Sequence, residues 1–161
     1  MNIKIKYLFL GSVMWILLSH NAFGQYQEQI RLHYSNEYGL GNNLFGFNLV
    51  GEYFLIDNLS FAPSATILFP ATGKASAFNF NARYYFTEED IQLYGLAGYG
   101  IFRRRYEHNP ELNFDNRGSI NLGAGVLYKI YDEIGLNFEI KVQPQNNGEV
   151  WLKLGMLYYI N

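Results

Sequence analysis

The sequence has no cysteine, only four prolines among 161 residues, and few charged side chains (16%). Without cysteine the chain forms no disulfide and no cysteine metal site, and an export signal of the lipoprotein type is excluded. After residue 24 no apolar run approaches the roughly 20 residues that a transmembrane helix needs, and no stretch has helical periodicity. Any membrane-spanning part must therefore consist of strands, because in lipid every backbone polar group has to be paired within the protein.

The first 24 residues have the pattern of an export signal. Lys4 and Lys6 provide a positive start, residues 7–18 are apolar, and small residues precede Gln25. The apolar run is short for a membrane span, which favours a cleaved signal peptide over the alternative, a retained membrane anchor. We therefore predict a signal peptide at residues 1–24 and one domain at residues 25–161.

Composition excludes several classes of function. Removal of the signal, which contains two Lys and no acid, leaves 10 Lys and Arg against 14 Asp and Glu, a formal net charge of −4. This balance gives no sign of a nucleic-acid-binding protein. The sequence has no phosphate-binding glycine loop, and neither His20 nor His108 has metal-ligand spacing. We expect no cofactor, no metal and no nucleic-acid partner. Aromatic residues are dense instead, with 14 Tyr, 13 Phe and 2 Trp.

Apolar and polar residues alternate in segments of about ten residues, which is typical of strands with two different faces. In residues 134–143, Leu136, Phe138 and Ile140 share one face, and Glu139 and Lys141 share the other. Six segments show this pattern: 30–38, 59–69, 78–86, 119–130, 134–143 and 151–160. Residues 45–55 show it less cleanly, because Val50 and Phe54 share the face of Asn48 and Glu52. Residues 92–102 form an eighth segment without an obvious polar face. Eight strands suit a closed antiparallel barrel.

The connections between these segments also alternate. The even connections are short and acidic and follow aromatic-rich strand ends: 56–58, 87–90 and 131–133. The odd connections include one long segment, and two of them carry Lys or Arg: 41–43, 70–74, 104–117 and 144–148. In bacterial transmembrane barrels the short turns face the periplasm and the longer loops face outside. We therefore expect both ends of the domain on the periplasmic side.

An alternating eight-stranded barrel can be a water-soluble barrel with an apolar interior or a membrane barrel with the reverse arrangement. The apolar faces carry too many aromatic side chains for so narrow a lumen, and the opposite faces carry charges of both signs that can pair inside it. We predict an all-β, eight-stranded antiparallel up-and-down transmembrane β-barrel preceded by a cleaved signal peptide. Its lumen contains a polar network of Arg31, His33, Glu37, Glu52, Arg83, Lys129, Glu139, Lys141 and Lys153. A filled lumen is favoured, and a channel for small solutes is the alternative.

Three patterns carry a resemblance to a known group. They are the aromatic strand ends before acidic turns, Leu-Tyr-Gly-Leu-Ala-Gly-Tyr-Gly at residues 93–100, and Gly-Ala-Gly-Val-Leu-Tyr at residues 123–128. With these patterns the domain resembles the small outer-membrane β-barrel proteins of the OmpA/OmpX/OmpW-like type, in particular the Bacteroidetes-type outer membrane protein beta-barrel domain. The resemblance implies an integral location in the bacterial outer membrane, among its lipids and lipopolysaccharide.

The last strand is similar to the assembly signal that such proteins present to the barrel assembly machinery during insertion. The matching residues are Lys153, Gly155, Tyr158 and Ile160. The chain departs from the pattern by ending in Asn161 rather than an aromatic residue.

Two further motifs suggest sites. His33-Tyr34-Ser35-Asn36 resembles the His-x-Ser-Asn motif of outer-membrane lipid A deacylases. The alternation turns His33 and Ser35 into the lumen, which favours an interior polar layer over a catalytic pair.

The second motif is Arg103-Arg104-Arg105, at the start of the longest odd connection. It is a possible contact for lipopolysaccharide phosphates, because guanidinium groups bind phosphate bidentately. The alternative is solvated loop charge balanced by nearby acids.

We predict no catalytic residue and a non-enzymatic role in envelope integrity or in loop-mediated interaction. The alternatives are a lipid A-modifying hydrolase that uses His33 and Ser35, and a solute channel.

Overall fold

The computed structural model describes residues 28–106 and 114–160. The predicted signal peptide and Asn161 lie outside these residues. The described chain forms eight strands: β1 (Ile30–Gly39), β2 (Leu44–Ile56), β3 (Leu59–Phe69), β4 (Lys74–Tyr85), β5 (Ile91–Arg105), β6 (Asp115–Lys129), β7 (Ile134–Gln143) and β8 (Glu149–Ile160). It contains no helix long and apolar enough to cross a membrane.

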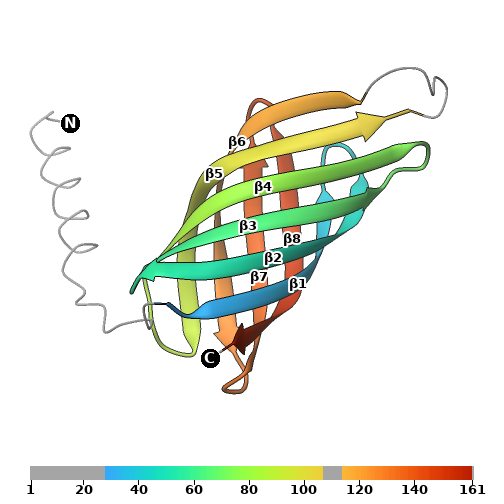
Figure 1. The fold of residues 1–161 in the computed structure, drawn as a ribbon. Coiled ribbons are helices and arrows are strands. Elements are labelled where there is room, and N and C mark those ends of the chain that lie inside the picture. Colours follow the sequence, from blue (N-terminus) through green and yellow to red (C-terminus); the bar gives the residue numbers. More distant parts are fainter. Residues whose placement is uncertain (1–27, 107–113, 161) are drawn as a thin grey trace, which may run out of the picture.

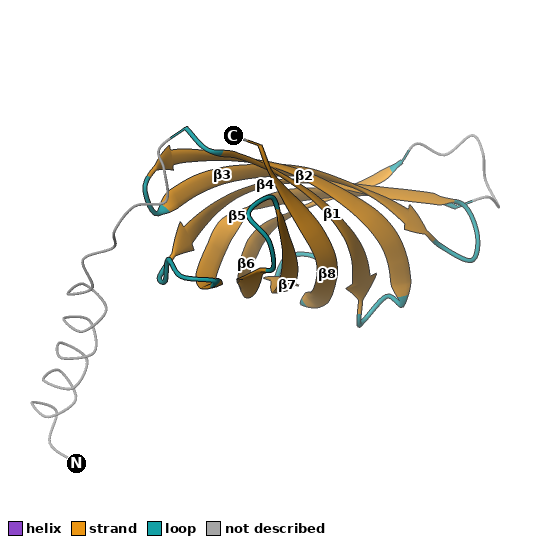
Figure 2. Ribbon diagram, turned by 90° about the horizontal axis from the view of Figure 1, so that it is seen from below, coloured by secondary structure: helices purple, strands orange, loops and turns teal. Residues whose placement is uncertain are grey.

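The strands form one closed antiparallel barrel in chain order (Figure 1). Each strand pairs with its neighbour in sequence, and β1 pairs with β8 from Ile30↔Ile160 to Gly39↔Trp151, which closes the wall. Figure 2 shows the strands curving together into one wall. The predicted eight-stranded up-and-down barrel is therefore confirmed.

Side-chain burial alternates along most of the wall because successive side chains of a strand point to opposite faces of the sheet. The alternation ends where β5 and β6 extend to Arg105 and from Asp115, at which both faces are at least partly exposed. In β1, Ile30, Leu32 and Tyr34 are exposed on the outer surface, whereas Arg31 and His33 are 1% and 0% exposed in the interior. Polar side chains therefore face the bore and apolar side chains face outward.

The β5–β6 hairpin is longer than the sequence predicted. Arg104 pairs with Asp115 and Phe102 pairs with Arg117, so the ladder continues into the segment predicted as a loop at residues 104–117. Figure 1 shows this hairpin and the β3–β4 hairpin projecting beyond the β1–β2 and β7–β8 hairpins. The loop predicted at residues 104–117 was therefore too long. Charged side chains do not end a strand, because the hydrogen bonds between the two strands are made by the backbone.

Candidate functional site

The centre of the bore is an ionic cluster around Glu139. Its carboxylate accepts hydrogen bonds from Arg83 Nη2 at 2.6 Å, from Lys153 Nζ at 2.7 Å and from the Tyr94 hydroxyl at 2.8 Å. Glu139 and Arg83 are completely buried, and Lys153 is 2% exposed. These residues come from β4, β5, β7 and β8, so the cluster joins opposite walls of the barrel.

Two further carboxylates have their own buried partners. Glu37 accepts from Lys141 Nζ at 2.8 Å and from the Thr66 hydroxyl at 2.8 Å. Glu52 lies 2.7 Å from His33 Nε2 and 3.3 Å from Arg83 Nη1. The hydroxyls of Ser60 and Tyr85 donate to its other oxygen. Each carboxylate therefore has at least one charged partner and one hydroxyl donor, which offsets the loss of hydration in the interior.

Arg31 lies among aromatic rings near the end of the barrel that carries the even turns. Its guanidinium carbon is 4.4 Å from the centroid of Phe54, 4.8 Å from that of Tyr159 and 5.3 Å from that of Tyr85. It also donates to Gln92 Oε1 at 3.1 Å. Cation–π contacts of this kind help to hold the guanidinium group in the interior of the barrel.

A layer of amide side chains lies between the ionic cluster and the end of the barrel that carries the odd loops. Asn121 Nδ2 donates to Asn79 and Asn81 at 3.0 and 2.8 Å, and Gln143 Nε2 donates to Asn121 Oδ1 at 2.7 Å. Gln143 also accepts from the indole of Trp151 at 2.9 Å. These bonds connect β4, β6, β7 and β8 through side chains alone.

Buried apolar clusters lie at both ends of the polar layers. The cluster on the side of the odd loops contains Leu44, Leu68, Ala75, Ala77, Phe102 and Trp151. The cluster on the side of the even turns contains Phe54, Tyr85, Tyr94, Leu96, Leu127, Leu157 and Tyr159. The bore of the described barrel is therefore filled by packed and hydrogen-bonded side chains, as expected for eight strands.

The structure places eight of the nine predicted lumen residues in the bore: Arg31, His33, Glu37, Glu52, Arg83, Glu139, Lys141 and Lys153. Lys129 lies elsewhere. It is the last residue of β6, and its ammonium group is 3.0 Å from Asp132 in the following turn, with 34% of its side chain exposed. Its long side chain reaches solvent at the barrel rim, which explains why it does not join the network.

Sequence reasoning missed the uncharged members of the network. Tyr85 and Tyr94 point inward and donate to Glu52 and Glu139. The inward position of Tyr94 could have been inferred from strand pairing, because partners across an antiparallel ladder share a face. Tyr94 pairs with Tyr85, and Tyr85 lies at an inward position by the alternation of residues 78–86.

His33 and Ser35 both lie inside the bore and are completely buried. His33 Nε2 is bonded to Glu52, and no hydrogen bond joins His33 to Ser35 within the described residues. Among these residues no group of three or more His, Asp or Glu side chains could hold a metal ion.

The three consecutive arginines do not form one cluster. Arg103 and Arg105 lie on the outward face of β5, with guanidinium carbons 4.8 and 5.2 Å from the ring centroid of Phe114. Arg104 lies on the opposite face, over the ring of Tyr106 at 4.5 Å. There it lines a cavity of about 300 Å³ with Asn42, Phe102, Tyr106, Asp115, Arg117, Asn146, Asn147 and Glu149.

The predicted assembly-signal residues lie on both faces of β8. Tyr158 and Ile160 are exposed on the outer surface, whereas Lys153 points into the bore. Gly155 packs against the backbone of Tyr34 and against Ser35, and a larger side chain there would clash with both.

The outer surface is a continuous apolar belt. It includes Leu32, Tyr34, Phe47, Leu49, Phe61, Ile67, Phe80, Tyr99, Leu122, Phe138, Ile140, Leu154 and Met156, all exposed. A water-soluble barrel would place such side chains inside and the charges outside. An apolar exterior around an ionic bore defines a transmembrane β-barrel of the outer-membrane type.

No protein-family model matches the sequence, and no curated protein matches it. Solved structures of small outer-membrane barrels share the fold. The N-terminal β-barrel domain of Pseudomonas aeruginosa OprF aligns with a TM-score of 0.71 at 18% identity, covering 83% of this chain and 98% of that chain. Ail, the attachment invasion locus protein of Yersinia pestis, aligns with a TM-score of 0.61 at 19% identity, covering 83% and 97%. Neisserial surface protein A aligns with a TM-score of 0.55 at 18% identity, covering 82% and 94%. The chain thus has the fold and the polarity of a small integral outer-membrane β-barrel protein.

Proposed function

We propose that this protein is a non-enzymatic, integral outer-membrane barrel with a closed bore, which supports envelope integrity and holds its outer hairpins at the cell surface. The observation that carries the proposal is the ionic network of the bore, enclosed between two apolar layers. A solute would have to displace paired and buried charges to pass, and uncompensated buried charge is costly.

The arrangement of His33 and Ser35 supports a role without catalysis. A serine nucleophile needs a base within hydrogen-bond reach, and the imidazole of His33 is bonded to Glu52 instead. Both side chains are also separated from the lipid by the barrel wall, since they are buried on its inner face. A lipid substrate has no route to them in this conformation.

Vesicles that contain the folded mature protein are expected to release trapped small ions no faster than empty vesicles, and planar bilayers are expected to show no steady conductance. The physical reason is that the bore holds packed side chains where a channel holds water. The folded fraction is measured on the same vesicles by its resistance to unfolding in unheated gel samples. A steady single-channel current from folded protein would favour the channel over the closed barrel.

We further propose that the chain belongs to the OmpA/OmpX/OmpW-like, Bacteroidetes-type group and that the barrel assembly machinery inserts it. The aromatic strand ends and the pattern of residues 153–160 support this assignment. The outward positions of Tyr158 and Ile160 on a strand that closes the barrel also support it, because a recognition signal must be accessible before closure.

Replacement of Tyr158 and Ile160 by Ser is expected to slow insertion by reconstituted assembly machinery by about tenfold, an order-of-magnitude estimate for the loss of two apolar anchors. The matched control is Tyr131→Ser, which changes an exposed tyrosine in the β6–β7 turn. Insertion is followed by the appearance of folded protein over time. Equal rates for the double variant and the control would rule out recognition through these two residues.

A further inference from the structure

The outer surface changes from apolar to basic near the projecting end of β4 and β5. Phe78 pairs with Ile101, and both are exposed in the apolar belt. Ser76 pairs with Arg103 two residues further along, and Lys74 then pairs with Arg105. Partners across an antiparallel ladder share a face. Lys74, Arg103 and Arg105 therefore point outward, directly beyond the edge of the belt.

The aromatic ring of Phe114 holds the two arginines in place. Their guanidinium carbons lie 4.8 and 5.2 Å from its centroid, within the range of a cation–π contact. Arg103 Nε also donates to Asn116 Oδ1 at 3.2 Å, and within the described residues neither terminal nitrogen of Arg103 has a hydrogen-bond partner. Within residues 28–106 and 114–160, no ion pair joins Lys74, Arg103 or Arg105 to an acid.

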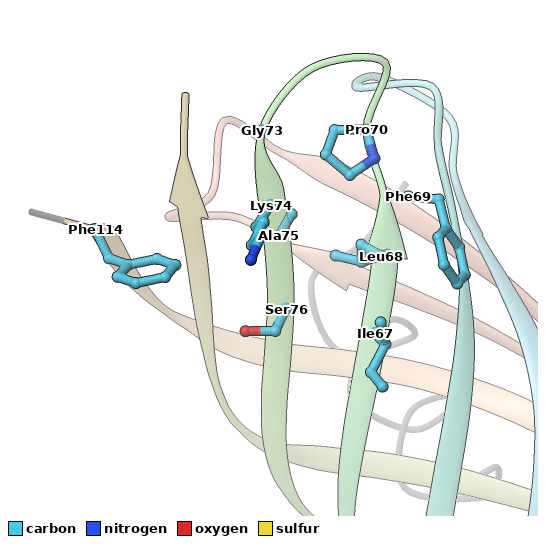
Figure 3. Close-up of a pocket in the computed structure, with 9 residues that line it drawn as sticks. All are labelled: Ile67, Leu68, Phe69, Pro70, Gly73, Lys74, Ala75, Ser76 and Phe114. Carbon is cyan, nitrogen blue, oxygen red and sulfur yellow. The ribbon is translucent and has the colours of Figure 1, made fainter. Parts of the chain in front are cut away.

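An apolar groove lies next to these cations. It has a volume of about 450 Å³, and the residues that line it include Ile67, Phe69, Pro70, Ser76 and Phe114. Figure 3 shows Lys74 and Ser76 on β4 between Phe114 on one side and Ile67 and Phe69 on the other. Ile67 is 64% exposed and Phe69 is 52% exposed, so an apolar ligand can reach both.

We propose that this surface binds a phosphorylated glycolipid of the outer leaflet. Arg103, Arg105 and Lys74 hold its phosphate groups, and one acyl chain lies in the groove against Ile67 and Phe69. Arginine recognises phosphate through two parallel hydrogen bonds, and lysine adds a compact charge. Three cations on one face match a headgroup with two phosphates better than a phospholipid with a single phosphate. The site rests on the proposed outer-membrane orientation, in which the odd loops face outside.

Arg104 provides an internal control for this proposal. It lies between Arg103 and Arg105 in sequence but on the opposite face of β5, over Tyr106 and at the mouth of the bore. A site on the outer surface therefore excludes Arg104, whereas a diffuse attraction between the basic hairpin and anionic lipid includes all three arginines equally.

The experiment compares binding of lipid A to the full mature protein in detergent with binding to the triple variant Lys74→Gln, Arg103→Gln, Arg105→Gln and to Arg104→Gln. The triple variant is expected to bind lipid A about tenfold or more weakly, and Arg104→Gln is expected to stay within about twofold of the wild type. Equal losses in both variants, or no loss in the triple variant, would overturn the proposal. Folding is checked on the same samples by the difference in gel migration with and without heating.

A second comparison changes the lipid and keeps the wild-type protein. Dephosphorylated lipid A and phosphatidylglycerol are each expected to bind about tenfold more weakly than lipid A, because they have no phosphate or one phosphate on the headgroup. Equal binding of all three lipids would show that the phosphate groups do not contribute to binding, and it would contradict the proposal. A conducting bore, by contrast, would contradict only the proposed function, since the lipid site lies on the outer wall.

Discussion

Replacement of Glu139 by Gln is expected to lower the free energy of unfolding by about 3–5 kcal/mol. The carboxylate of Glu139 is the counter-charge of both Arg83 and Lys153, at 2.6 and 2.7 Å, and all three side chains are buried. A neutral amide leaves two cations in the interior with less compensating charge, and it turns a donor toward one of them. The loss is large because water cannot reach the cluster to replace the missing charge.

The loss is measured by urea unfolding of the folded protein in lipid vesicles. Trp151 is the one tryptophan after residue 24, and it lies in the bore, so its fluorescence reports on unfolding of the barrel. The matched control is Glu133→Gln in the exposed β6–β7 turn, which is expected to change stability by no more than about 0.5 kcal/mol.

A second substitution separates lost pairing from lost packing. The double variant Glu139→Gln, Lys153→Met removes Lys153, one of the two buried cations, together with its counter-charge. The double variant is expected to be destabilised by less than the sum of the two single variants, since neighbours in one network are coupled by about 0.5–3 kcal/mol. Additive effects, or a neutral Glu139→Gln variant, would show that the ionic cluster does not support the barrel.

Replacement of Leu49 by Arg is expected to lower the free energy of unfolding in bilayers by about 2–4 kcal/mol. Leu49 lies halfway along β2 between Tyr34 and Ala65, it is 52% exposed, and the apolar belt surrounds it. A cation at this depth must enter hydrocarbon or distort the bilayer to reach water. In a water-soluble barrel the same exposed position would accept Arg with little effect.

The control for this prediction is Ile56→Arg on the same strand. Ile56 is also exposed, but it lies at the end of β2 next to the turn, where the penalty falls to about 0–1 kcal/mol. Both variants are compared by urea unfolding in vesicles. A similar small effect at the two positions would contradict the transmembrane arrangement, because the penalty for a lipid-facing cation depends on its depth in the bilayer.

Alternation along the chain was sufficient to predict the wall of the barrel. In residues 134–143 the positions of Leu136 and Phe138 against Glu139 and Lys141 predict the observed outward and inward faces. The reason is local, since the pleat of a strand sends successive side chains to opposite sides. In residues 92–102 the inward side chains include Tyr94, Leu96 and Phe102, so polarity could not identify the faces, and the pairing with β4 decided them.

The same local rule would have separated the three arginines. Once β5 continues to Arg105, alternation places Arg104 on one face and Arg103 and Arg105 on the other. The sequence did not show that the strand continues, because Arg104 pairs with Asp115, a partner that lies eleven residues further along the chain. The length of a strand depends on the residues of the neighbouring strand that pair with it as well as on its own residues.

The sequence by itself determined that the chain forms strands with charges on their inner faces, and it left only the faces of residues 92–102 undecided. The physical reason is the period of two, together with the poor match between many aromatic side chains and a narrow lumen. Only the tertiary structure decided which charges meet. Arg83 and Glu139 are 56 residues apart on β4 and β7, which are not neighbours in the sheet. Their contact exists because the closed wall brings opposite strands within reach of a side chain, and that distance is set by the curvature of the whole barrel.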